Sequence, residues 1–113
     1  MHELSLVQSI FRSIEEQFPG RMDKLLRVKV KAGLLSNVQP LLMQSAWDAV
    51  LECEAQYAGI QLDMEVLPVL IQCDACGKVS QVDDYVFICT CGEPCRNIIQ
   101  GNELMISEVE FDE

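Results

Sequence analysis

A chain of 113 residues is long enough for one ordinary core, or for a small core with an appendage that a metal ion holds together. Half of the residues are hydrophobic, which excludes a disordered chain. The net charge of −10, from 18 acids against 8 bases, argues against nucleic-acid binding, because nucleic-acid binders carry an excess of Lys and Arg.

The chain begins with a predicted amphipathic helix over residues 3–18, which Pro19 and Gly20 end. Its apolar residues recur at steps of three and four and would share one face: Leu4, Val7, Phe11, Ile14 and Phe18. Residues 25–32 then alternate as a strand. Five bases crowd into this part of the chain: Arg21, Lys24, Arg27, Lys29 and Lys31. We interpret them as the solvated face of the strand, with a docking patch for an acidic partner as the alternative.

A second helix is predicted after Ser36, whose spacing from Gln39 resembles a capping box. Pro40 is tolerated there because it would lie in the first turn, and Gly59 marks the exit. The expected buried face is Val38, Leu42, Ala46, Ala49 and Cys53. Cys53 is therefore expected to be a core residue, and Trp47 a core or edge anchor.

Two further strands are predicted, at residues 60–67, which Pro68 closes, and at 103–111. The order of elements indicates an α+β fold, with two helices packed on a small three-stranded sheet and a zinc-ribbon module inserted before the last strand. We expect residues 1–70 to form one domain, completed by a strand at about 98–113, and residues 71–97 to form the ribbon.

Five of the six cysteines fall within residues 73–95, as Cys73-Asp-Ala-Cys76-Gly and Cys89-Thr-Cys91-Gly-Glu-Pro-Cys95. Two cysteine-bearing turns about a dozen residues apart can close a tetrahedron around one ion, with zinc as the first candidate. Four sulfurs leave no open position for water, so the ion is expected to be structural.

A disulfide framework is the alternative for clustered cysteines, but it needs an oxidising compartment and usually a secretory signal. The first residues show no signal, and no apolar run is long enough to span a bilayer, so we expect a cytoplasmic protein that contacts no membrane. No nucleophile, base and orienting group come together in the sequence, which predicts that the protein is not an enzyme.

The only histidine, His2, stands beside the terminal amine and the carboxylate of Glu3. A nitrogen-rich set of donors suits Ni(II) and Cu(II) better than zinc. Taken alone, however, a histidine at position 2 is more often an incidental polar residue on a frayed terminus.

Several segments together resemble one known family. They are Met1-His2-Glu3-Leu4-Ser5-Leu6, the stretch from Val28 to Val38, Cys73-x-x-Cys76-Gly77, Phe87-x-Cys89-x-Cys91-Gly92 and Gly101-Asn-Glu-Leu104. This set resembles the HypA family of hydrogenase nickel-incorporation proteins, in order and in length.

The resemblance implies a nickel metallochaperone for [NiFe]-hydrogenase maturation, which carries Ni(II) and Zn(II) at separate sites. It implies His2 as a nickel ligand supported by Glu3, and a four-cysteine zinc site with a structural or sensing role. The implied partners are a HypB-like GTPase and the large subunit of a [NiFe]-hydrogenase, with a urease accessory protein as a further candidate.

One departure from the family pattern leaves the ligand set open. Its second pair of cysteines is usually separated by two residues, whereas one residue separates Cys89 and Cys91 here. The spacing favours Cys73, Cys76, Cys89 and Cys91, and the alternative replaces Cys89 by Cys95. A spare thiolate beside a filled site would permit ligand exchange, which suits a sensor. Two other functions share this motif: a zinc-ribbon adaptor without nickel, and a rubredoxin-like carrier of a single iron.

Overall fold

The structure is a computed structural model that describes residues 2–112, with side chains from residue 3 onward. It contains two α-helices, α1 (His2–Gln17) and α2 (Pro40–Cys53), and three short 3₁₀ helices, η1 (Met22–Lys24), η2 (Leu34–Ser36) and η3 (Ala55–Tyr57). The strands are β1 (Leu25–Gly33), β2 (Gln61–Leu67), β3 (Leu70–Gln72), β4 (Val79–Gln81), β5 (Ile98–Gln100) and β6 (Leu104–Phe111).

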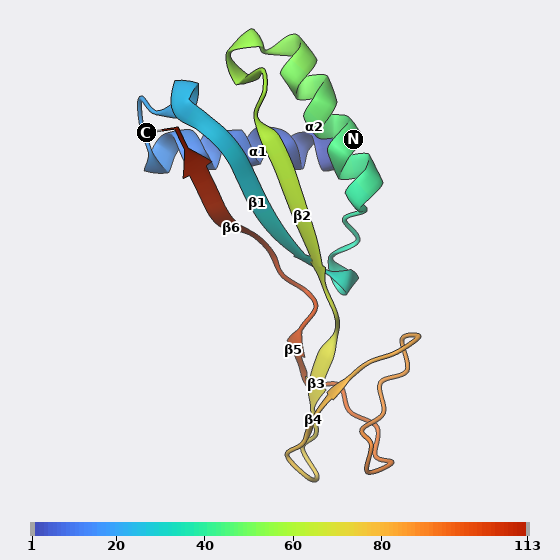
Figure 1. The fold of residues 1–113 in the computed structure, drawn as a ribbon. Coiled ribbons are helices and arrows are strands. Elements are labelled where there is room, and N and C mark those ends of the chain that lie inside the picture. Colours follow the sequence, from blue (N-terminus) through green and yellow to red (C-terminus); the bar gives the residue numbers. More distant parts are fainter. Residues whose placement is uncertain (1, 113) are drawn as a thin grey trace.

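The first sheet has the order β2-β1-β6 and carries both helices on one face (Figure 1). Strand β1 runs parallel to β2, with Val28 opposite Leu62, and antiparallel to β6, with Val28 opposite Val109. A parallel neighbour requires a crossover connection, and α2 provides it between β1 and β2. We call this part, residues 2–67 and 104–112, the helix–sheet unit.

The core of the helix–sheet unit lies between the sheet and the two helices. Trp47 of α2 is fully buried at its centre, and its indole Nε1 donates a hydrogen bond of 2.9 Å to the carbonyl of Ile60. Phe11 of α1 packs against the Trp47 ring at 4.6 Å and stacks on Tyr57 at 4.3 Å between centroids. The buried indole therefore joins α1, α2 and the start of β2.

The predicted buried face of α2 is wrong by one residue. Val38, which precedes the helix, is buried as predicted. Within α2 the buried residues are Met43, Trp47 and Val50, whereas Leu42 is 48% exposed and Cys53 is exposed as well. The two faces are about 100° apart on the helix, and both are apolar in sequence. Burial of the large indole decides between them, because it removes more apolar area from water than the smaller side chains on the other face.

The predicted capping box is also absent. Gln39 occupies the N-cap position of α2 without a side-chain hydrogen bond, and Pro40 follows in the first turn as expected. The Ser36 hydroxyl instead donates to the carbonyl of Gly33 at 2.7 Å and accepts from the backbone N–H of Val38 at 3.4 Å. Ser36 thus stabilises the turn after β1 rather than the helix.

The bases of β1 lie on the sheet face that points away from the helices, which agrees with their interpretation as a solvated face. Arg27 forms an ion pair with Glu110 of β6 at 3.0 Å, and Lys29 forms one with Glu65 of β2 at 3.7 Å. Acids on both flanking strands therefore offset the central row of bases. A docking patch for an acidic partner is not favoured by this arrangement.

The second sheet has the order β4-β3-β5, and we call residues 69–100 that contain it the ribbon. Strand β3 continues the path of β2 beyond Pro68, and β5 leads into β6, so two chain segments connect the ribbon to the helix–sheet unit (Figure 1). The predicted completing strand at 98–113 is thus shared: residues 98–100 pair with β3, and residues 104–111 pair with β1.

The α+β fold with a projecting ribbon is confirmed, and the molecule is elongated, with extents of 53 × 27 × 17 Å. Among residues 2–112, neither α-helix has the length and apolar character needed to cross a membrane.

The link between the two parts is a set of close backbone contacts. The N–H of Gly33 donates to the carbonyl of Glu103 at 2.7 Å, and the N–H of Leu35 donates to that of Gly101 at 2.8 Å. Gly101 has a φ of +129°, which favours glycine, and a Cβ on Gly33 would overlap the backbone of Gly101. The two glycines allow the end of β1 and the start of β6 to touch.

Candidate metal centre

The first cysteine pair lies on the tight turn between β3 and β4. The N–H of Cys73 donates to the carbonyl of Lys78 at 2.9 Å, and the N–H of Gly77 donates back to the carbonyl of Cys73 at 2.8 Å. Gly77 has a φ of +75°, a left-handed conformation that glycine adopts without steric cost. This turn places the thiols of Cys73 and Cys76 on the same side.

The second pair lies on a similar turn. The N–H of Cys89 donates to the carbonyl of Glu93 at 2.9 Å, and the N–H of Gly92 donates to the carbonyl of Cys89 at 2.8 Å. Gly92, with a φ of +94°, provides the left-handed residue here. The backbone N–H of Cys91 also points at the Cys89 sulfur, 3.5 Å away. The spacing of one residue between Cys89 and Cys91 is therefore compatible with a turn that presents both thiols.

The two turns bring the four thiols of Cys73, Cys76, Cys89 and Cys91 together, with all their sulfurs within 4.8 Å of one another. Two of the separations are 3.5 Å, between the sulfurs of Cys76 and Cys89, and 3.8 Å, between those of Cys73 and Cys91. A tetrahedral zinc ion with Zn–S bonds of about 2.3 Å requires sulfurs about 3.8 Å apart. The cluster therefore has the donors and the size for a zinc ion.

Cys95, the alternative ligand, lies outside this cluster. It is 3% exposed and packs in a small core with Val69, Ile71 and Val82. Its thiol donates to the carbonyl of Gln72 at 3.1 Å, and its N–H donates to the carbonyl of Phe87 at 2.9 Å. The geometry thus gathers the favoured set of four thiols and leaves Cys95 as a packing residue.

The pKa values of two thiols in the cluster are shifted in opposite directions, that of Cys89 downward and that of Cys91 upward. The hydrogen bond from the backbone N–H of Cys91 lowers the pKa of Cys89 to about 6, in spite of the opposing effect of burial. A backbone hydrogen bond from Glu93 acts to lower the pKa of Cys91, but the Cys89 thiol and burial outweigh it and raise this pKa to about 12. Cysteine binds a metal as the thiolate, so metal binding to this cluster should weaken as the pH falls.

The predicted nickel site falls largely outside the described residues. Helix α1 begins at His2, and Glu3 is the first residue with a described side chain, half-buried in the first turn. Met1 and the imidazole of His2 belong to the part of the chain that the structure does not describe. Their roles as nickel ligands stay predictions.

The comparison with family models decides the family. The model described as "Hydrogenase/urease nickel incorporation, metallochaperone, hypA" matches residues 1–111, almost the whole chain. The chain belongs to the HypA family. It is therefore a member of a family of metallochaperones rather than of enzymes.

Relatives and solved structures agree with the HypA assignment. A protein from Desulfitobacterium hafniense named hydrogenase maturation factor HypA is 35% identical over 118 residues, with all of both chains covered. The solution structure of the nickel metallochaperone HypA from Helicobacter pylori is similar with a TM-score of 0.64, at 26% identity and with 96% of each chain covered. A second solution structure of a HypA protein gives a TM-score of 0.69, at 27% identity and with 98% of this chain and 96% of that chain covered.

Proposed function

We propose that this HypA protein binds Ni(II) at its N-terminus and delivers it during the maturation of a [NiFe]-hydrogenase. The observation that carries the proposal is the family match over residues 1–111, which includes the His2-Glu3 terminus. The described structure supports it in one respect. It gathers four thiols into a cluster on the ribbon, whereas α1, the helix that begins at His2, belongs to the helix–sheet unit.

The proposed nickel ligands are the imidazole of His2 and the amine and backbone nitrogens next to it, with Glu3 as a supporting group. Nitrogen and oxygen donors of this kind suit Ni(II). At a chain end they can be exchanged one at a time for the ligands of a recipient protein. A cage of four thiolates releases its ion far less readily, so transfer and retention fall to different ends of the molecule.

The proposed occupant of the cysteine cluster is Zn(II), with a structural role and the capacity to report on nickel occupancy. A single iron would fit four sulfurs equally well in geometry. Metal analysis separates the two: zinc gives a colourless protein with one ion per chain, whereas iron would give a red, redox-active one. The proposed partners are a HypB-like GTPase, the hydrogenase large subunit and a urease accessory protein.

The test is a calorimetric titration of Ni(II) into zinc-loaded protein without any N-terminal tag, compared with the His2→Ala variant. Replacing a residue that only hydrogen-bonds to a metal ligand typically weakens metal binding about 10- to 100-fold. Loss of the ligand itself should therefore weaken nickel binding at least about tenfold. Affinity should also fall as the pH drops below about 6, because imidazole must be neutral to bind.

Gln8→Ala, an exposed change on the same helix, is the matched control and should bind nickel like the parent protein. Equal stoichiometry and affinity in the His2→Ala variant would remove the nickel role from His2.

A further inference from the structure

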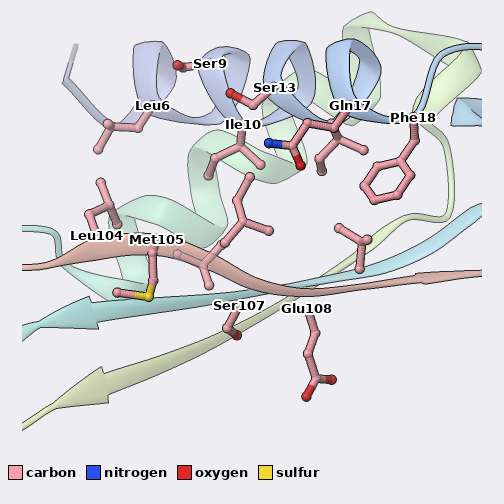
Figure 2. A pocket seen from close by; sticks show the side chains of 14 residues that line it. Leu6, Ser9, Ile10, Ser13, Gln17, Phe18, Leu104, Met105, Ser107 and Glu108 are labelled. Carbon is pink, nitrogen blue, oxygen red and sulfur yellow. The ribbon is translucent and has the colours of Figure 1, made fainter.

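A groove runs between helix α1 and strand β6 in the helix–sheet unit (Figure 2). Its volume is about 530 Å³, and Ile10 and Ile14 of α1 lie along it with Val30 of β1. The groove exists because α2 covers the side of the sheet near β2, where Trp47 bonds to Ile60, while α1 alone covers the side near β6. With α1 alone above it, the space beside β6 is only partly filled and forms the groove.

Strand β6 is the edge of the sheet beside this groove. Its one neighbour among the described strands is β1, so its outer N–H and C=O groups can accept another strand. Leu104 and Met105 at its start are 36% and 47% exposed. The strand contains neither Lys nor Pro, which are residues that commonly protect an edge from pairing. Its shift in register near Lys29 and Val30 is the one protective irregularity along its middle.

The two faces of β6 differ in chemistry. Leu104 points toward Leu6 of α1, whereas Ser107 and Glu108 point away from the helix (Figure 2). On that outer face Glu110 is paired with Arg27. Glu108 lies opposite Lys29 of β1, whose ammonium forms its ion pair with Glu65 of β2 instead, so among residues 2–112 the Glu108 carboxylate forms no ion pair. The segment 103–112 contains four acids and no base: Glu103, Glu108, Glu110 and Asp112.

We propose that the groove and the free edge of β6 bind an extended segment of another protein as a fourth strand, with apolar side chains toward α1 and basic side chains beside Glu108. Strand side chains alternate between faces, so the segment would alternate apolar and basic residues. A second copy of this chain does not fit, because two β6 edges would place acids against acids. The proposal does not depend on nickel binding.

The probe is a fluorescein-labelled octapeptide of alternating Val and Lys, titrated with the zinc-loaded protein and followed by fluorescence anisotropy. A peptide of equal charge with Pro in place of Val is the control, since Pro cannot donate to a sheet. The first peptide should bind saturably and the second should not. Backbone amide shifts should change in β6 and in the facing turns of α1. Equal binding of both peptides, or shifts confined to the ribbon or to β2, would overturn the proposal.

The matched variants are Glu108→Lys on β6 and Glu52→Lys on α2, both exposed and both adding the same charge. Glu108→Lys should weaken peptide binding by about tenfold, because it places a base beside the bases of the peptide. Glu52→Lys lies far from the groove and should weaken peptide binding less than about twofold. Neither site lies in a core, so both variants are expected to fold, which their circular dichroism would verify. Equal losses in the two variants would show that the peptide senses only net charge and would reject the strand-addition site. A dimer of the parent protein through β6 would reject it as well.

Discussion

The two parts of this molecule are stabilised by different means. Among the described residues, the helix–sheet unit has a core of thirteen buried residues, drawn from α1, α2 and β1, with Val38 and Ile60 from the adjoining segments. The ribbon buries only Val69, Ile71, Val82 and Cys95 in its own cluster. Burial of apolar area is the main favourable term in folding, and a core of four residues contributes little of it. The ribbon therefore needs its four-thiol site to hold its turns in place, while the helix–sheet unit does not.

The way in which each part is stabilised also determines which kind of metal site it can carry. A unit held together by a metal cannot release that metal without unfolding, so the cluster is suited to a resident ion. The core of the helix–sheet unit depends on no ion, so gain or loss of the proposed N-terminal nickel should leave that core unchanged. The two parts should therefore respond independently: loss of the metal should affect the ribbon, and a change in the hydrophobic core should affect the helix–sheet unit.

The largest effect is expected from Cys89→Ser. This change removes one of four ligands, and structural zinc contributes about 10–16 kcal/mol in small zinc-binding peptides. The variant should lose its tightly held zinc, and the amide signals of the ribbon should collapse to unfolded positions. The signals of the helix–sheet unit, including the buried indole of Trp47, should stay in place. Metal analysis and a two-dimensional amide spectrum measure both results.

The matched control for this experiment is Cys95→Ser, because Cys95 is also buried but lies outside the cluster. It should keep one zinc per chain and lose only about 1–2 kcal/mol, the usual cost of disturbing a small buried residue and its hydrogen bond. Loss of zinc in Cys95→Ser with zinc retained in Cys89→Ser would reverse the ligand assignment.

The second prediction concerns the core of the helix–sheet unit. Trp47→Ala should lower the free energy of unfolding by about 3–5 kcal/mol, because it leaves a large cavity and an unpaired carbonyl at Ile60. Urea unfolding followed by circular dichroism measures this loss. The zinc content should not change.

Leu42→Ala tests the corrected face of α2 in the same assay. Leu42 is about half exposed, so its truncation should change stability by no more than about 0.5 kcal/mol. A cost close to that of Trp47→Ala would mean that the face carrying Leu42 is buried after all.

Periodicity predicted the elements of the helix–sheet unit well, because each strand and the first helix carries one apolar face. Helix α2 failed this test, since Leu42 and Met43 are both apolar and so are Ala49 and Val50. Which of two apolar faces is buried depends on how Trp47 meets Phe11 and the start of β2, and these are contacts between segments far apart in sequence.

The candidate metal centre was likewise predictable from local sequence only in part. Spacing identified two cysteine-bearing turns and favoured Cys89 over Cys95, but it left Cys95 as an alternative. The fold separates the two thiols, because Cys89 lies in the four-thiol cluster and Cys95 reaches the carbonyl of Gln72 in β3. The groove beside β6 had no signal in the sequence, since it arises from the position of α1 over the edge of the sheet.

A smaller effect than that of Trp47→Ala is expected at the contact that joins the two parts. Gly33→Ala adds a Cβ that overlaps the backbone of Gly101, so the strands must separate. Overpacking of this kind costs about 1–3 kcal/mol. Amide hydrogen exchange should become faster at Leu35, whose N–H bonds to Gly101. Zinc should stay bound, because the link and the cluster use different residues.

Gly20→Ala is the control for this last variant, because Gly20 has a positive φ but open space around it. It should lower stability through backbone strain while leaving exchange at Leu35 unchanged. If Gly33→Ala also released zinc, the ribbon would depend on the helix–sheet unit for its fold, and the two parts would be one cooperative structure. If amide hydrogen exchange at Leu35 becomes faster while zinc is retained, the glycine contact only connects two parts that are stabilised separately.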